Sequence, residues 1–355
     1  MEPELEVLSF ANATLVVPKG YSPALNLRET EAAIKFVKDN FQLRLAQVLN
    51  LQRVSAPLMV LGETGINDHL NEVERPVSFE VSDMKKTAEV MQSLAKWKRL
   101  ALADYGFEHG EGLYTDMNAI RRDERLTNLH SIYVDQWDWE RVISEEERSI
   151  AFLKRIVRRI YSVIRDMEGV TCNRFPQLRK PFLPDDIFFI HAQELEDRHP
   201  GLAPQERENE ICREKGAVFI MGIGADLESG KPHDGRAADY DDWWTIADGK
   251  RGLNGDILVW YPVLNCAVEL SSMGIRVDQT SLEEQLKIRG QEYKKNLYYH
   301  RRLLKGELPL TIGGGIGQSR LCMLYLRKAH IGEVQASVWH DDLFKACKQN
   351  NIRLL

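Results

Sequence analysis

A glycine-rich run near the C-terminus has the clearest chemical meaning in this chain. Residues 311–321 read Thr-Ile-Gly-Gly-Gly-Ile-Gly-Gln-Ser-Arg-Leu. Glycines let a backbone approach a flat ligand closely, and a helix that begins at about Gly317 would place Arg320 on its first turn, facing that ligand. We interpret the run as a nucleotide-binding element without a P-loop. A flexible turn is the alternative interpretation, because glycine-rich segments also favour turns.

A second group of reactive side chains lies in residues 269–276, which combine a carboxylate, two hydroxyls and a guanidinium. On a regular strand, Glu269 and Ser271 would share one face. Asp256, from the preceding predicted strand, could join Glu269 in holding Mg²⁺ against a triphosphate, since Mg²⁺ binds one or two carboxylates together with phosphate oxygens. For either acid alone, a cross-strand polar network or an exposed pair is the alternative interpretation.

A third polar segment predicts a strand with two different faces. Gln136, Asp138 and Glu140 alternate with two tryptophans. Strand geometry puts the three polar side chains on one face and the tryptophans on the other. Further polar clusters are expected at the ends of predicted elements, at Asp68 and in residues 93–98, 121–138 and 236–242.

Hydrophobic periodicity predicts the elements that must position these residues. Apolar residues recur at steps of three and four between residues 29 and 48, which predicts a helix. Residues 51–60 predict a strand whose Pro57 indicates an edge or interface position. Ser144 and Glu147 have the spacing of a capping box, which predicts the start of a long helix. Other strands are expected at residues 77–81, 112–122, 130–142, 187–190, 217–223, 256–261 and 263–271, and other helices at 94–105, at 282–305 and, as the last one, after the glycine run.

These elements predict one α+β domain with a mostly antiparallel sheet flanked by helices. Residues 1–25 lack clear periodicity, so we expect an N-terminal extension there and a single catalytic domain over residues 26–355. The polar, glycine-containing residues 224–255 are long enough to form a lid or binding loop.

Composition narrows the class of protein. The 355 residues carry a net charge of −6, with acidic and basic residues mixed, which disfavours nucleic acid as a partner. The 5 cysteines are scattered without the spacing of a zinc site or a disulfide framework. The N-terminus has no apolar signal region and no apolar run is long enough to cross a bilayer. We therefore expect a cytoplasmic protein with no membrane partner.

Seven segments of the chain together resemble a known family. They closely resemble the ammonia-dependent asparagine synthetases, asparagine synthetase A, also called aspartate–ammonia ligases. That family shares the catalytic fold of class II aminoacyl-tRNA synthetases and looks most like the aspartyl enzyme. The resemblance runs from about Glu29 to the C-terminus and rests on residues 93–99 (SLAKWKR), 110–115 (GEGLYT), 133–141 (YVDQWDWER), 239–243 (DYDDW), 252–260 (GLNGDILVW), 269–276 (ELSSMGIR) and the glycine run.

The resemblance implies an activity: ATP-dependent conversion of L-aspartate and ammonia to L-asparagine, AMP and diphosphate through a β-aspartyl-adenylate, in a homodimer that uses Mg²⁺. Pro57 matches the first class II motif, at the dimer interface. Arg121 matches the arginine that grips the α-phosphate, although the adjacent Arg122 leaves open which of the two faces ATP. Arg320 matches the third-motif arginine that lies against the adenine or the γ-phosphate.

The resemblance also implies the rest of the site. Asp68 matches the base for ammonia, and it joins Arg121 and Lys98 as the residues expected to be catalytic. Asp256 and Glu269 match the metal acids. ATP binding is expected at Arg121, Asp256, Glu269, Gly313, Gly314 and Arg320, and aspartate binding at Ser93, Lys98, Gln136, Asp138, Asp241, Ser272 and Arg276.

Two other functions remain as alternatives on the same fold. An aspartyl-tRNA synthetase-like enzyme would need a surface for tRNA, which neither the length nor the acidic balance provides. A non-catalytic, amino-acid-binding regulatory paralogue would be expected to lose a phosphate-binding arginine or a metal acid. A glutamine-dependent synthetase would begin with a catalytic cysteine, whereas position 2 here is Glu2, so free ammonia is the expected nitrogen donor.

Overall fold

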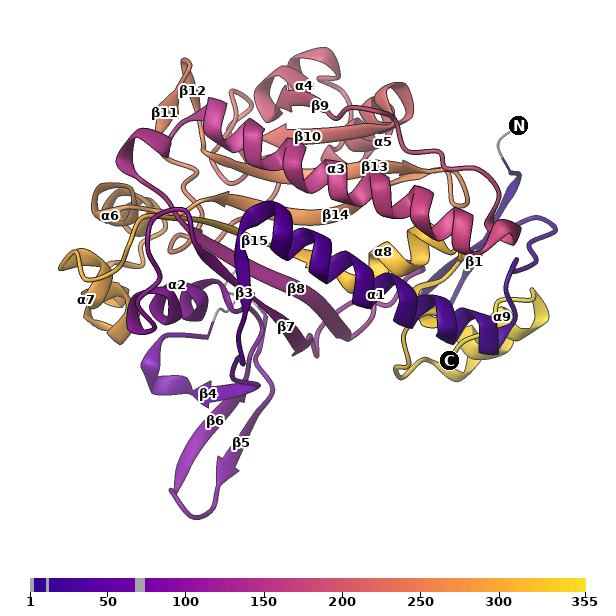
Figure 1. The fold of residues 1–355 in the computed structure, drawn as a ribbon, viewed down its shortest axis with the longest axis horizontal. Coiled ribbons are helices and arrows are strands. Elements are labelled where there is room, and N and C mark those ends of the chain that lie inside the picture. The colour runs from indigo at the N-terminus through magenta and orange to yellow at the C-terminus, as the bar shows by residue number, and fades with distance from the viewer. Residues whose placement is uncertain (1–2, 11–12, 68–73) are drawn as a thin grey trace.

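The computed structural model describes residues 3–10, 13–67 and 74–355, and its centre is an eight-stranded sheet (Figure 1). The central pairings are antiparallel, and each edge strand pairs in parallel with its neighbour. This arrangement confirms the predicted α+β class. In spatial order the strands are β3 (Leu51–Arg53), β7 (Gly112–Ile120), β8 (Tyr133–Val142), β15 (Thr311–Gly317), β14 (Cys266–Ile275), β13 (Asn254–Tyr261), β10 (Ala217–Met221) and β9 (Phe188–His191).

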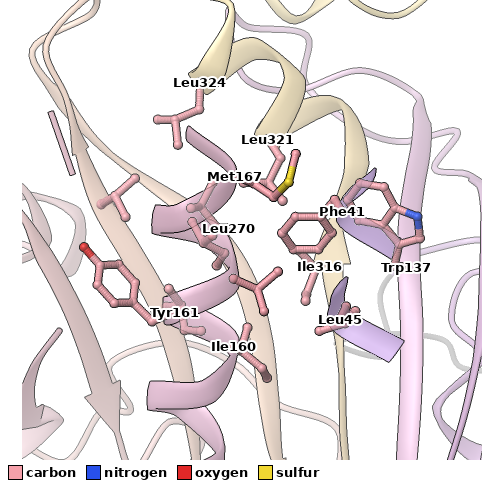
Figure 2. Close-up of a cluster of buried hydrophobic side chains, with 14 of the residues drawn as sticks. Phe41, Leu45, Trp137, Ile160, Tyr161, Met167, Leu270, Ile316, Leu321 and Leu324 are labelled. Carbon is pink, nitrogen blue, oxygen red and sulfur yellow. The ribbon is translucent and has the colours of Figure 1, made fainter. Parts of the chain in front are cut away.

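Two long helices, α1 (Leu27–Leu49) and α3 (Ile150–Arg174), lie side by side across one face of the sheet (Figure 1). Their apolar stripes meet the apolar side of the strands in the main core, where Phe41 stacks on Trp137 with ring centroids 4.6 Å apart (Figure 2). This burial confirms the tryptophan face predicted for β8. Its polar face therefore points to the other side of the sheet.

That second side carries α2 (Ala95–Asp104) and α5 (Pro204–Lys215). Lys98 of α2 reaches Asp138 there, and Ile211 of α5 packs on Ile220 of β10. The remaining elements surround the sheet. They are α4 (Ala192–Arg198), β11 (Ile246–Ala247), β12 (Lys250–Arg251), α6 (Gln279–Ile288), α7 (Tyr298–Leu304), α8 (Gln318–Tyr325), α9 (Asp341–Gln349) and the 3-10 turns Gly62–Thr64, Glu145–Glu147, Pro176–Leu178, Glu292–Asn296 and Ile331–Glu333.

Several predicted elements are divided in the structure. Residues 51–60 do not form one strand: β3 ends at Arg53, and Met59 begins β4 (Met59–Leu61) in a separate three-stranded sheet with β5 (Ser78–Val81) and β6 (Lys86–Val90). Pro57 lies between them, where it disturbs neither ladder. Residues 282–305 form two helices, because Gly290 adopts a left-handed φ of 65° after α6.

Helix starts also differ from the prediction. The capping box of Ser144 and Glu147 is present, but it closes a single 3-10 turn. The long helix α3 begins at Ile150, where the Ser149 side chain accepts a hydrogen bond from Phe152 N. The helix after the glycine run begins at Gln318 as expected, but α9 follows it, so it is not the last one.

The N-terminal residues form a hairpin of β1 (Leu5–Ser9) and β2 (Thr14–Pro18), which packs on α9 near the C-terminus (Figure 1). Within the described part of the chain, no helix has both the length and the apolar content to cross a membrane.

Candidate active site

A cavity of about 220 Å³ opens on the polar side of the sheet. It is bounded by strands β8, β14 and β15, by the start of α2 and by the loop after β10. Most of the predicted site residues meet on its wall. They are Ser93, Lys98, Arg121, Gln136, Asp138, Asp241, Glu269, Ser272, Arg276 and Gly314.

A second cavity of about 90 Å³ shares wall residues Arg121, Gln136 and Glu269 with the first. Arg320 lines this second cavity, as predicted for a residue that contacts nucleotide. The two cavities therefore adjoin, and Arg121 lies at their junction. Arg122 is exposed and lines neither cavity, so Arg121 is the arginine of this turn that faces the site.

Two of the described site residues lie outside both cavities, and a third prediction has no described position. Asp256 and Gly313 line neither cavity, but each lies next to a residue that lines the first one. Asp256 contacts Arg236, and Gly313 lies beside Arg276. Asp68, the predicted base, falls outside the described residues.

A bulge in β14 decides which of its side chains reach the cavity. Leu258 pairs with Glu269 but Ile257 pairs with Ser271, so Leu270 is an extra residue in the ladder. The extra residue reverses the alternation, and Ser272 rather than Ser271 joins Glu269 on the wall. The predicted pairing of Glu269 with Ser271 on one face is therefore wrong.

The glycine run forms β15, and its glycines make room for side chains of the neighbouring strand. A Cβ on Gly313 would collide with the Glu140 carboxylate, and one on Gly315 would collide with the Gln136 amide. Gly314 and Gly315 line the first cavity. Close approach is thus the reason for glycine here, but at Gly313 and Gly315 the groups approached are protein side chains, whereas the predicted approach was to a flat ligand.

Buried ion pairs fix the charged groups at the cavity floor. Lys98 Nζ contacts the Asp138 carboxylate, lies 3.1 Å from Gly314 O and 3.9 Å from Glu140 Oε2. Arg276 lies between Glu140, at 2.8 Å, and Asp241. Burial raises the pKa of Glu140, but the charges of Arg276 and Lys98 outweigh burial and hold that pKa below its usual value. The network therefore keeps its charges in fixed positions.

Two guanidinium groups, those of Arg121 and Arg320, lie on the wall of the second cavity together with Glu269. Arg320 Nη1 donates to the Glu269 carbonyl at 3.0 Å and lies 3.6 Å from its carboxylate. Burial, together with the charges of Arg320 and Arg121, lowers the pKa of His130 in the second cavity to about 4, although Glu269 opposes the shift. Two planar guanidinium groups in these positions can donate paired hydrogen bonds to phosphate oxygens.

Comparison with known proteins indicates the same family that the sequence motifs resemble. A family model described as aspartate-ammonia ligase matches residues 28–351. The chain belongs to the aspartate–ammonia ligase family. It is 59% identical to an aspartate–ammonia ligase of Clostridium perfringens over 342 residues (96% of this chain and 99% of the relative), and 59% identical to that of Ruminiclostridium cellulolyticum over 343 residues (96% and 99%).

Solved structures extend this family's likeness to class II synthetases. An asparaginyl-tRNA synthetase of Entamoeba histolytica, in complex with asparaginyl-adenylate, superposes with a TM-score of 0.64 at 14% identity; the match covers 87% of this chain and 66% of that one. The corresponding enzyme of Pyrococcus horikoshii gives 0.63 at 16%, covering 88% and 70%. At these identities the likeness concerns the fold, which is that of the class II catalytic domain.

The acids predicted to bind metal in this family member lie close enough to interact. Burial and the negative charge of Glu269 raise the pKa of Asp256 to about 7, although Arg236 contacts its carboxylate and opposes the shift. Among the described residues, no group of three or more His, Cys, Asp or Glu could hold a metal ion. Glu269 lines both cavities, whereas Arg236 contacts the Asp256 carboxylate, so Mg²⁺ held by both acids together with phosphate would have to replace that contact.

Sequence analysis missed several wall residues of the ligase, among them Arg236, Tyr240 and Gln92. Arg236 and Tyr240 belong to a polar cluster that was noticed without a role for either residue. Gln92 gave no signal, because a glutamine before a helix has no distinctive pattern. Its position became apparent only from the cavity.

Proposed function

We propose that this ligase makes asparagine in two steps that share one intermediate, β-aspartyl-AMP. As a member of its family, the protein is an ATP-dependent enzyme that joins aspartate and ammonia into asparagine. In the first step, a β-carboxylate oxygen of aspartate attacks the α-phosphorus of ATP and pyrophosphate leaves. In the second, ammonia attacks the acyl carbon, the bond to the bridging oxygen breaks, and AMP leaves with that oxygen.

The observation that carries the proposal is the pair of adjoining cavities with Arg121 at their junction. An adenylate joins an amino acid to a nucleotide through one phosphate. It would span both cavities with that phosphate beside Arg121. A positioned guanidinium there stabilises the negative charge that develops on the phosphorus oxygens, which is commonly a large contribution to catalysis.

The first cavity suits aspartate because it offers fixed charges of both signs. Asp138 Oδ2 is buried without a hydrogen-bond partner in the described part of the chain, so it can accept a hydrogen bond from the α-ammonium group of aspartate. Asp241 adds negative charge beside it, and Lys98 and Arg276 supply cations for the carboxylates. We assign Ser93, Gln136 and Ser272 to the polar wall around the substrate.

The nucleotide would lie in the second cavity. We propose that Arg320 contacts the adenine or the γ-phosphate, since a planar guanidinium can stack and donate hydrogen bonds together. Gly315 and Gly317 of β15 line this cavity, whereas Gly313 and Gly314, which were also expected at ATP, do not. Asp256 and Glu269 would hold Mg²⁺, which when bound neutralises phosphate charge.

The second step needs free ammonia, because ammonium has no lone pair. We propose that Asp68 attracts the ammonium ion and takes its proton. In Asp68→Asn, aspartate-dependent pyrophosphate release should survive while asparagine formation falls about 10²–10⁴-fold. Equal loss of both steps, or no loss of either, would remove Asp68 from this role.

A homodimer is proposed on the basis of one apolar groove. Leu58, next to Pro57, lines it together with Ile120 and Val338, and all three are exposed. Exposed apolar groups that gather in this way mark an interface. Sedimentation that gave a monomer at micromolar concentration would contradict the proposal.

Three broader assignments are also proposals. We propose that residues 26–355 act as one catalytic unit with residues 1–25 as an extension. We also propose that the enzyme is cytoplasmic. Its net charge of −6 supports the proposal that it has no nucleic-acid partner. Proteolysis into two stable halves would contradict the single unit. Sedimentation of the enzyme with membranes on cell fractionation would contradict a cytoplasmic location.

The products decide the reaction. The protein is incubated with ATP, Mg²⁺ and aspartate, with and without ammonium, and AMP, ADP, pyrophosphate, phosphate and asparagine are measured. We expect AMP and pyrophosphate, and asparagine only with ammonium. ADP with phosphate would contradict the adenylate. Aspartate attached to added tRNA would favour the aminoacylating alternative.

A further inference from the structure

The side chain of Gln92 lies on the wall of the first cavity, and its polar atoms lack hydrogen-bond partners among the described residues. The residue lies between β6 and α2 and is 1% exposed. Neither Nε2 nor Oε1 has a hydrogen-bond partner among the described residues. Of the described residues on this wall, Gln92 is the one with two such atoms.

Hydrogen bonds hold the main chain at Gln92 in place, so the residue is not loosely positioned. Its N–H donates to Asn67 Oδ1 at 2.9 Å, and Met91 N donates to Leu58 O at 3.0 Å. Asn67 is itself buried. The backbone therefore fixes Gln92 in its position on the cavity wall.

An unpaired buried carboxamide destabilises a protein, and the great majority of buried polar groups are paired. At a cavity wall the missing partner is most simply a ligand atom. A carboxamide offers one donor and one acceptor side by side, which is the pattern complementary to another primary carboxamide. A carboxylate offers acceptors only, so it would leave the Gln92 oxygen opposed to an oxygen.

Asparagine and aspartate differ in this one respect, since the product carries a primary amide where the substrate carries a carboxylate. Both molecules share the α-ammonium and the α-carboxylate, so charged wall residues that bind these two groups do not tell product from substrate. Recognition of the new nitrogen therefore falls to a neutral group that can accept a hydrogen bond.

We propose that the Gln92 carboxamide recognises the nitrogen in the amidation step. Its Oε1 accepts a hydrogen bond from the incoming ammonia and later from the product amide, while Nε2 donates to the acyl oxygen. Ammonia held through one N–H keeps its lone pair free to attack the acyl carbon. Donation to the acyl oxygen stabilises the negative charge that develops there. Gln92 takes no proton, so the base remains a separate group, and the inference rests on the proposed adenylate pathway.

The test uses Gln92→Met, which keeps length and apolar volume but removes both hydrogen-bonding groups. The matched control is Gln291→Met: the Gln291 oxygen is also buried without a partner among the described residues, but Gln291 lines neither cavity. Gln92→His keeps one donor and one acceptor and serves as the conservative variant. Dissociation constants for asparagine and aspartate are measured by calorimetry, together with kcat/KM for ammonium and ammonium-free pyrophosphate release.

For Gln92→Met we expect asparagine to bind at least tenfold more weakly and aspartate less than threefold more weakly. The value of kcat/KM for ammonium should fall about 10–100-fold, because one or two hydrogen bonds of about 1–1.5 kcal/mol are lost. Pyrophosphate release should stay within threefold of the parent. Gln92→His should recover part of the ammonium effect, and Gln291→Met should match the parent.

Unchanged constants, equal weakening of both amino acids, or the same loss in Gln291→Met would overturn the inference. Each result is distinct from failure of the proposed function. If the parent enzyme itself forms no AMP and pyrophosphate, the adenylate pathway fails. If the parent forms them and Gln92→Met behaves like the parent, only the role of Gln92 fails.

Discussion

At the scale of single residues, the account depends on which guanidinium groups meet the ligand. Arg121 and Arg320 reach the cavities while Arg122 points to solvent. Sequence alone left Arg121 and Arg122 equivalent, because adjacent residues at a strand end differ in direction and not in chemistry. In the structure, Arg121 lines both cavities and Arg122 is exposed to solvent.

Lysine substitution at this pair tests the separation. Arg121→Lys keeps the charge but loses the planar fork that can donate two bonds to one phosphate. We expect kcat/KM for ATP to fall about 100-fold, which corresponds to about 2.7 kcal/mol of transition-state stabilisation. Arg122→Lys is the matched control and should stay within threefold in steady-state kinetics. A larger loss in Arg122→Lys than in Arg121→Lys would reverse the assignment.

The pKa of His130 reports on the charge of the second cavity. Burial and the nearby arginines lower the pKa of His130 to about 4 from an ordinary 6.5. The folded protein therefore binds fewer protons than the unfolded chain in this range, so the contribution of His130 to stability is present above pH 6.5 and is lost as pH falls toward 4.

An NMR titration of the imidazole, assigned with His130→Gln, measures this pKa directly. We expect a value well below 6.5 in the free enzyme and a higher value with ATP bound, since triphosphate offsets the positive charge of Arg320 and Arg121. A value near 6.5 that ATP does not change would show that the second cavity is not the nucleotide pocket.

At the scale of elements, β15 positions the site because its glycines leave space for side chains of the neighbouring strands. Gly313 leaves the space in which Glu140 pairs with Arg276, and both partners are nearly fully buried. A methyl group there could be accommodated only if that pair moved. The strand thus links the sequence of the glycine run to the geometry of the first cavity.

Gly313→Ala should therefore destabilise the enzyme by about 1–3 kcal/mol, as overpacking does, and raise KM for aspartate. Gly169→Ala is its control, because Gly169 lies within α3 and an added Cβ would meet nothing within 4 Å. We expect this control to gain about 0.5–1 kcal/mol from helix propensity. Urea unfolding and aspartate kinetics measure both effects. Equal stability of the two variants would contradict the packing role of Gly313.

Sequence predicted the elements whose periodicity is regular and missed local departures from it. The stripe of α1 and the two faces of β8 follow directly from spacing, so Asp138 was placed correctly. The bulge at Leu270 could not be predicted, because it depends on how β13 and β14 pair. The break near Gly290 was missed because one glycine within a helical pattern is often tolerated. Most of the residues predicted from chain motifs line one of the two cavities, whereas Gln92, which tertiary packing places on the wall, carries no motif.

At the scale of the whole molecule, the N-terminal hairpin is joined to the wall of the second cavity. Asn128, which is buried, accepts from Val16 N and donates to Val16 O and Ala329 O, each at 2.7 Å. The residues after it, Leu129 and His130, line the second cavity. One side chain therefore connects the hairpin, the C-terminal region and the cavity wall.

Asn128→Ala should lower stability by about 2–4 kcal/mol, because it leaves several buried backbone groups without partners. KM for ATP should rise, while aspartate affinity should change little, since the first cavity is held by other elements. Asn40→Ala is a suitable control: Asn40 donates within α1, to Phe36 O. Thermal unfolding and steady-state kinetics measure both. An ATP dependence identical to the parent would show that the hairpin does not support the nucleotide pocket.

The central claim, that the β-carboxylate is activated on the α-phosphorus, is tested most directly by following oxygen. Aspartate labelled with ¹⁸O in its β-carboxylate is converted with unlabelled ATP and ammonium, and the products are analysed by mass spectrometry. The account predicts AMP that carries one ¹⁸O and pyrophosphate that carries none; aspartate labelled in the α-carboxylate should leave AMP unlabelled. Label in inorganic phosphate with ADP as the nucleotide product, or AMP without label, would contradict it.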